Sequence, residues 1–189
     1  MGSIPAEATH VLQSEAPRAR PSEDWKETAR SWLVSTPGTV HLVGVGNPIR
    51  QDDAVGVAIV AALRRSLGSR PAPNVVIHPP CFMPERLLSK VAATGGSLMV
   101  FDAVEANMEP GAVVCASLAD TKFGFFATHN VPLRLIPEVA GSLGGSFVVG
   151  VQPEWLGVGE ELSVTAQAAK SRVVAAMSTI IGGMRDGHA

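Results

Sequence analysis

The chain has 189 residues, of which 46% are hydrophobic and 17% charged, and its formal net charge is −2. This composition is typical of a globular protein with a sizeable buried core. A chain with so little net charge offers no concentrated basic face, so neither nucleic acid nor a membrane surface is expected as a partner. No apolar run is long enough to span a membrane and no secretory signal is recognisable, so a soluble protein is expected. Only two cysteines occur and they have no CxxC spacing, which fits a reducing, cytoplasmic compartment.

The first part of the chain differs in composition from the rest. Residues 1–37 contain four prolines and closely spaced charges of both signs, which predicts a flexible N-terminal extension. Within it, Ser22 is a candidate N-cap and two tryptophans follow at roughly helical spacing, a pattern that permits a short helix at 22–34. A single domain is predicted over residues 38–184.

Strands and helices are predicted to alternate through this domain. A β-branched apolar run at 39–45, closed by Gly-Asn-Pro, predicts a buried strand, and an apolar face with acids at its start predicts a helix over 52–67. The same criteria predict strands at 74–78, 97–102, 112–115 and 146–151. They also predict helices at 84–93, after the segment 127–133 as far as about residue 140, and at 162–181. The alternation predicts an α/β domain, a three-layer α/β/α sandwich whose central sheet has about five mostly parallel strands.

Three polar features follow strands of this predicted sheet. Asp52 and Asp53 come after the first strand, Asp102 stands at the tip of another, and His129 lies in a later loop. Ligands of such sheets bind at the carboxyl ends of the strands, so these side chains are expected to converge. Two carboxylates and one imidazole suit a borderline divalent metal and leave coordination positions open for something else.

Each of these residues also has an ordinary structural interpretation. Carboxylates at a helix start are stabilised by roughly 0.3–1 kcal/mol each, and one of them is enough to cap the helix. Because two adjacent acids repel each other, we assign helix capping to Asp52 and metal binding to Asp53. Asp102 could instead organise a turn at its strand end. His78, which also ends a predicted strand, competes with His129 for the role of ligand.

Familiar catalytic and nucleotide motifs are missing from the sequence. The glycines of Gly44-Val-Gly46 do not extend to GxGxxG, because Ile49 occupies the third position. There is no GxSxG or HExxH, and the two cysteines, Cys81 and Cys115, have no recognisable signature around them. No organic cofactor is therefore expected.

Four separated motifs stand out along the chain: Val43-Gly-Val-Gly-Asn47 followed by Asp52-Asp53; Phe101-Asp102-Ala103 with Pro110-Gly111; Thr128-His129-Asn130-Val-Pro-Leu; and Gly150-Val-Gln-Pro153. Together they resemble the endopeptidases that mature nickel-iron (NiFe) hydrogenases. The resemblance runs from about Val40 to the final helix and leaves the N-terminal extension without a counterpart.

The resemblance implies a twisted α/β sandwich and a specific proteolytic activity. Such an enzyme removes the C-terminal extension of the hydrogenase large-subunit precursor after nickel insertion, and aspartic-type chemistry is one assignment. Asp53, Asp102 and His129 would be both the catalytic and the metal-contacting residues, and the nickel would be supplied by the substrate. Gln152 and Glu154, together with Glu85, are secondary candidates for lining the cleft.

Two other functions fit the same residues. The three side chains could sense or carry nickel without catalysis, or they could hold a resident metal in an independent metallohydrolase. The sequence leaves both alternatives open.

Overall fold

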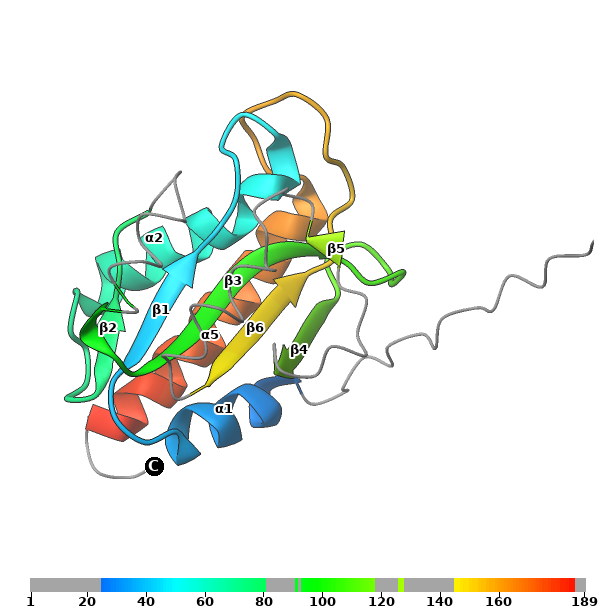
Figure 1. Cartoon of the computed structure of the whole chain (residues 1–189). Helices are drawn as coiled ribbons and strands as arrows, with labels where there is room; N and C mark the ends of the chain where they lie inside the picture. The colour runs from blue at the N-terminus through cyan, green and yellow to red at the C-terminus, as the bar shows by residue number, and fades with distance from the viewer. Residues whose placement is uncertain (1–24, 81–90, 92, 118–125, 128–144, 186–189) are drawn as a thin grey trace, which may run out of the picture.

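The computed structural model describes residues 25–80, 91, 93–117, 126–127 and 145–185. Its elements, shown in Figure 1, are α1 (Trp25–Ser35), β1 (Val40–Gly44), the 3-10 helix η1 (Gln51–Ala54), α2 (Val55–Leu67), β2 (Val75–Ile77), β3 (Ser97–Glu105), β4 (Val113–Ser117), β5 (Phe126–Ala127), β6 (Ser146–Val151) and α5 (Val164–Arg185). Within the described residues, no helix has the length and apolar character needed to cross a membrane.

The central sheet has the strand order β2-β1-β3-β6-β4. β1 is parallel to β2 and β3, β3 is parallel to β6, and β4 runs antiparallel to β6. The short β5 pairs antiparallel with the end of β3. These pairings confirm the predicted α/β class and the mostly parallel sheet. Because β2 and β6 lie on opposite sides of the β1–β3 pair, the chain changes direction there, and such a switch point is where α/β sheets bind ligands.

One face of the sheet is covered by α1, α2 and α5, which share a single hydrophobic core with it. Figure 1 shows α2 and α5 running behind the strands. The indole ring of Trp32 stacks on Phe147 of β6, with centroids 4.9 Å apart and an interplanar angle of 18°. Helix α1 therefore packs against the domain although it belongs to the predicted extension. Residues 1–24 lie outside the described residues, and the predicted domain boundary stays a prediction.

The opposite face of the sheet is also apolar and buried. It presents Val43, Leu98, Val100 and Val148, because alternate residues of a strand point to opposite faces. The helices predicted at 84–93 and before 140 lie mainly outside the described residues; of the first, residues 91 and 93 are helical, as is residue 94.

Strand β3 is longer than its apolar pattern predicted. It continues to Glu105, because Ala103 still pairs with β6 while Val104 and Glu105 pair with β5. The prediction that Asp102 ends its strand is therefore wrong. Asp102 is paired inside the sheet, opposite Gly150 of β6.

Candidate functional site

Asp53 lies in η1, between β1 and α2, and its side chain is fully buried, with 0% exposure. The surrounding backbone approaches so closely that only glycine fits at two positions. A Cβ on Gly46, whose φ is 145°, would collide with the carbonyl oxygen of Asp53, and one on Gly56 would collide with the carbonyls of Phe101 and Val45. These glycines therefore bring the start of α2 against the ends of β1 and β3, which accounts for the glycine motif without a phosphate ligand.

Asp102 is placed at the same end of the sheet. Its side chain is 2% exposed, and its Oδ1 accepts a hydrogen bond from the Ala103 amide at 2.8 Å. The preceding residue, Phe101, is paired with Gly44 of β1 and accepts a 2.9 Å bond from the Val45 amide. Since η1 also contacts β3, the structure places the segments that carry Asp53 and Asp102 side by side at the switch point. Buried carboxylates are costly unless donors or a cation compensate them, and the Ala103 amide is one such donor for Asp102.

The third predicted ligand, His129, lies outside the described residues, as does Glu85. Within the described part of the chain, no three histidine, cysteine, aspartate or glutamate side chains are grouped so that they could hold a metal. The complete set of Asp53, Asp102 and His129 therefore stays a prediction.

Asp52 is fully buried beside Asp53 but has a different environment. Its carboxylate accepts four hydrogen bonds, from the amides of Glu154 (2.8 Å), Trp155 (3.1 Å) and Ser163 (2.7 Å) and from the Ser163 hydroxyl (2.8 Å). The start of α2 has no side-chain cap, so the expected capping of that helix by Asp52 is wrong. The carboxylate instead binds the segment before α5, where the Ser163 hydroxyl in turn accepts from the Ala166 amide at 3.1 Å.

Backbone hydrogen bonds join the same two segments of the chain. We call residues 46–54 and 153–163 the paired loops. The Gln51 amide donates to Gly159 at 2.8 Å, the Gly159 amide donates to Ile49 at 3.0 Å, and the Asp52 amide donates to Trp155 at 3.2 Å. Figure 1 shows these loops together above the ends of β1 and β6. The turn that carries Asp53 is thus held in place by a segment more than a hundred residues away.

Gln152 and Glu154, the secondary cleft candidates, brace nearby loops. Gln152 Oε1 accepts from the amides of Ala106 at 2.8 Å and Met108 at 3.3 Å, which fixes the turn after β3. Glu154 Oε2 accepts from the Thr165 hydroxyl at 2.6 Å. These contacts position the loops around the site. The residues next to Gln152 and Glu154 in the sequence give no indication of this role.

His78, the competitor of His129, lies elsewhere in the sheet and pairs with His41. His41 Nδ1 and His78 Nε2 are 2.9 Å apart, and His41 Nε2 is 3.1 Å from the Gly95 carbonyl. A carbonyl only accepts, so His41 Nε2 carries a proton, and Nδ1 of the neutral ring accepts from His78. Burial lowers the pKa of His41, the nearby Arg70 cation also lowers it, and the bond to Gly95 opposes both effects.

This histidine pair lines a cavity of about 560 Å³ together with Arg70 and two threonines, Thr39 and Thr94. His41 is near the start of β1, whereas Asp53 follows the end of that strand. The histidine pair is therefore separate from the carboxylates.

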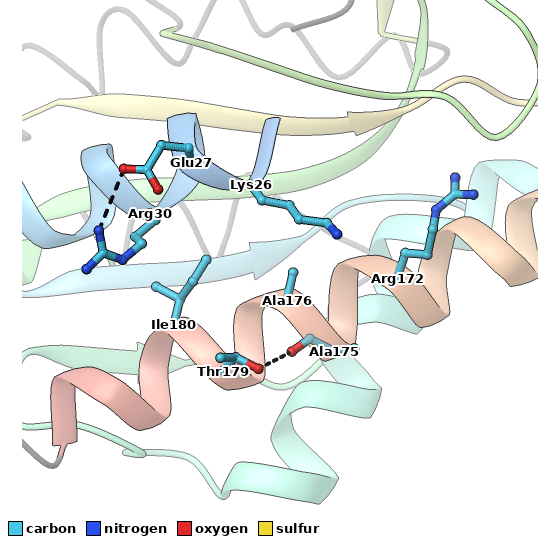
Figure 2. Close-up of a pocket in the computed structure, with 8 residues that line it drawn as sticks. All are labelled: Lys26, Glu27, Arg30, Arg172, Ala175, Ala176, Thr179 and Ile180. Carbon is cyan, nitrogen blue, oxygen red and sulfur yellow. Dashed lines mark hydrogen bonds and ion pairs between the residues drawn. The ribbon is translucent and has the colours of Figure 1, made fainter. Parts of the chain in front are cut away.

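A second cavity lies between α1 and α5 (Figure 2) and has a volume of about 510 Å³. Its charged lining residues include Lys26 and Arg172, and Arg30, which pairs with Glu27 at 3.6 Å. Arg172 also donates to the Gly111 carbonyl at 2.7 Å. Among the described residues, neither Asp53 nor Asp102 lines this cavity.

The fold and the buried acids define the class of protein: an open, mostly parallel α/β domain with a carboxylate site at its switch point. The chain is similar in structure to the NiFe hydrogenase maturation protease HycI from Thermococcus kodakarensis KOD1, with a TM-score of 0.69 and 26% identity over 82% of this chain and 98% of that chain. The resemblance predicted from the motifs is thereby confirmed, and this neighbour is itself a protease, the enzyme class that the resemblance implies.

Other solved structures share the fold at lower identity. The endopeptidase HycI from Escherichia coli has a TM-score of 0.61 and 23% identity over 72% of this chain and 87% of that chain. The hydrogenase maturating endopeptidase HybD from E. coli has a TM-score of 0.57 and 22% identity over 79% and 93%. No family model matches the chain, and no curated protein matches it either.

Proposed function

We propose that this protein is the endopeptidase that removes the C-terminal extension of a NiFe hydrogenase large-subunit precursor after nickel insertion. The observation that carries the proposal is the pair of buried carboxylates, Asp53 and Asp102, at the switch point of this fold. Its similarity to a NiFe hydrogenase maturation protease supports the substrate class.

In the proposed reaction, the nickel belongs to the substrate. Asp53, Asp102 and His129 contact the nickel held by the precursor, and this contact places the scissile peptide bond in the site. A water molecule polarised by the metal, or activated by one carboxylate, adds its oxygen to the scissile carbonyl carbon. The C–N bond then breaks, and the leaving amine takes up the proton that the attacking water gives up.

Buried carboxylates suit this role because their oxygens are ligands for a divalent metal, and Asp53 and Asp102 are 0% and 2% exposed. Asp52 uses its carboxylate to join the paired loops and so supports the turn that carries Asp53. In this proposal Asp52 is a positioning residue, while Asp53 and Asp102 contact the substrate.

The test is to incubate the full chain with its large-subunit precursor, with and without nickel, and to measure intact masses. The expected result is loss of the C-terminal extension from the nickel-loaded precursor alone. Equal cleavage of nickel-free precursor would contradict nickel recognition. Nickel binding without any cleavage would favour a carrier, and a stoichiometric resident metal with cleavage of small substrates would favour a metallohydrolase.

A further inference from the structure

Large apolar side chains are exposed next to the proposed site. Among the described residues, Val158 is 91% exposed, Val164 87%, Trp155 62% and Ile49 57%. The remaining exposed large apolar residue of this part of the chain, Val34, lies on α1 at 39%. We call Ile49, Trp155, Val158 and Val164 the apolar rim.

The rim residues surround the turn that carries Asp53. Val158 precedes Gly159, whose amide binds the Ile49 carbonyl at 3.0 Å, so the backbones of Ile49 and Val158 run close together. Trp155 accepts the Asp52 amide through its carbonyl, and Val164 follows Ser163, which donates twice to the Asp52 carboxylate. Ile49 thus belongs to the segment 49–52 that precedes Asp53, and the other three rim residues lie at or next to residues bonded to that segment.

The exposure of the rim is built into the fold. Backbone bonds and the buried Asp52 carboxylate fix the paired loops, so the backbone that carries Ile49, Trp155 and Val158 is held in place. Apolar side chains that a rigid scaffold holds in water mark sites of association, because covering them removes apolar surface from water.

We propose that the apolar rim is the docking surface for an apolar surface segment of the protein substrate. The inference rests on the proposed function, which places the substrate at Asp53 and Asp102. A protein occupant is favoured because the rim combines an aromatic anchor, Trp155, with aliphatic neighbours and has exposed acids, Glu160 and Glu161, at its border. An apolar centre with a polar border is the usual anatomy of protein interfaces.

The proposal assigns binding, rather than chemistry, to the rim. Each rim side chain contributes to holding the precursor before the peptide bond is broken, so its loss should raise KM and leave kcat nearly unchanged. The same residues would let the enzyme select a protein substrate by its surface.

The experiment measures precursor affinity and processing for Val158→Ser, Ile49→Ser and Trp155→Ser in the full chain. Each change is expected to weaken binding of the purified precursor and raise KM about tenfold, and more for Trp155, with kcat unchanged within about twofold. Val34→Ser, which removes an exposed apolar group far from the rim, is the matched control and should bind as the wild type does. Val158 and Ile49 keep the test valid if Trp155→Ser unfolds, because the Trp155 ring packs on Gly157.

The outcomes separate this inference from the proposed function. Wild-type affinity and KM in both Val158→Ser and Ile49→Ser would overturn the docking surface even if processing is normal. A protein that binds precursor through the rim but never cleaves it would overturn the proposed function alone. Sedimentation of the wild-type chain as a dimer that Val158→Ser converts to a monomer would make the rim a self-association surface and overturn the inference.

Discussion

The carboxyl edge of the sheet and the start of β1 both bury ionisable side chains, yet the two regions are built for different charges. At the carboxyl edge, Asp52 receives hydrogen bonds from three backbone amides and a hydroxyl, and Asp53 and Asp102 lie buried beside it. At the start of β1, His41 is held by His78 and Gly95, and burial lowers its pKa. The carboxylates of the first region favour a cation as ligand, whereas protonation of His41 would disturb the second region.

The largest effect is expected when a carboxylate is removed from the carboxyl edge of the sheet. Asp53→Ala or Asp102→Ala is expected to reduce processing of nickel-loaded precursor by about a thousandfold, because several kcal/mol of metal-dependent stabilisation is lost. Intact-mass kinetics measure the rate. Glu105→Ala removes an exposed acid from the same strand as Asp102 and should process normally. A rate near that of the wild type for Asp53→Ala would exclude Asp53 from the site.

The second prediction concerns the close backbone packing that brings the carboxylates together. Gly56→Ala would push its Cβ into two backbone carbonyls, so it should lower the free energy of unfolding by about 3 kcal/mol. Denaturant unfolding measures the change. Gly182→Ala in α5 is the control, because its Cβ meets open space and removing a helical glycine should stabilise the protein by about 0.5–1 kcal/mol. Equal effects of both changes would refute the packing argument.

The third prediction separates Asp52 from Asp53. Asp52→Ala leaves the amides of Glu154, Trp155 and Ser163 without their acceptor and should destabilise the protein by about 2 kcal/mol. Asp52→Asn keeps the shape of the side chain and one acceptor oxygen, so it should destabilise the protein less than Asp52→Ala does. Thermal unfolding gives the stability and intact-mass kinetics give kcat, which should fall with the loosened turn. An unchanged melting temperature in Asp52→Ala, matching that of the exposed-acid control Glu161→Gln, would contradict the bridging role.

The smallest predicted effect is the pH dependence of stability that the histidine pair causes, which the carboxyl edge should not share. Because the folded-state pKa of His41 is below the ordinary histidine value of 6.5, the unfolded chain takes up the proton first. The stability contributed by neutral His41 is therefore complete above about pH 6.5 and is lost as the pH falls through the lowered pKa. One proton limits the slope to about 1.4 kcal/mol per pH unit. Urea unfolding at several pH values should show this slope in the wild type and a smaller one in His41→Gln.

Much of the fold follows from local sequence patterns. Continuous apolar runs predicted β1, β2 and β6 to within one or two residues, and a helical apolar face with a terminal glycine predicted α2. These patterns are legible because strand and helix periodicity depends on neighbouring residues. The position of Asp53 after β1 was also predictable, since it needs only the order of strand, turn and helix.

Tertiary structure decided which partners the polar groups found. Asp52 is bound by residues 102 to 111 positions further along the chain, so the sequence around it indicated only a helix cap. Strand β3 passes beyond Asp102 because β5 and β6 offer it partners, and His78 joins His41 because β1 and β2 are adjacent. By itself, the sequence determined the α/β class, the family resemblance and the candidate residues Asp53, Asp102 and His129. Only the fold separated the bridging Asp52 from its neighbour, because hydrogen-bond choice depends on which donors packing brings within reach.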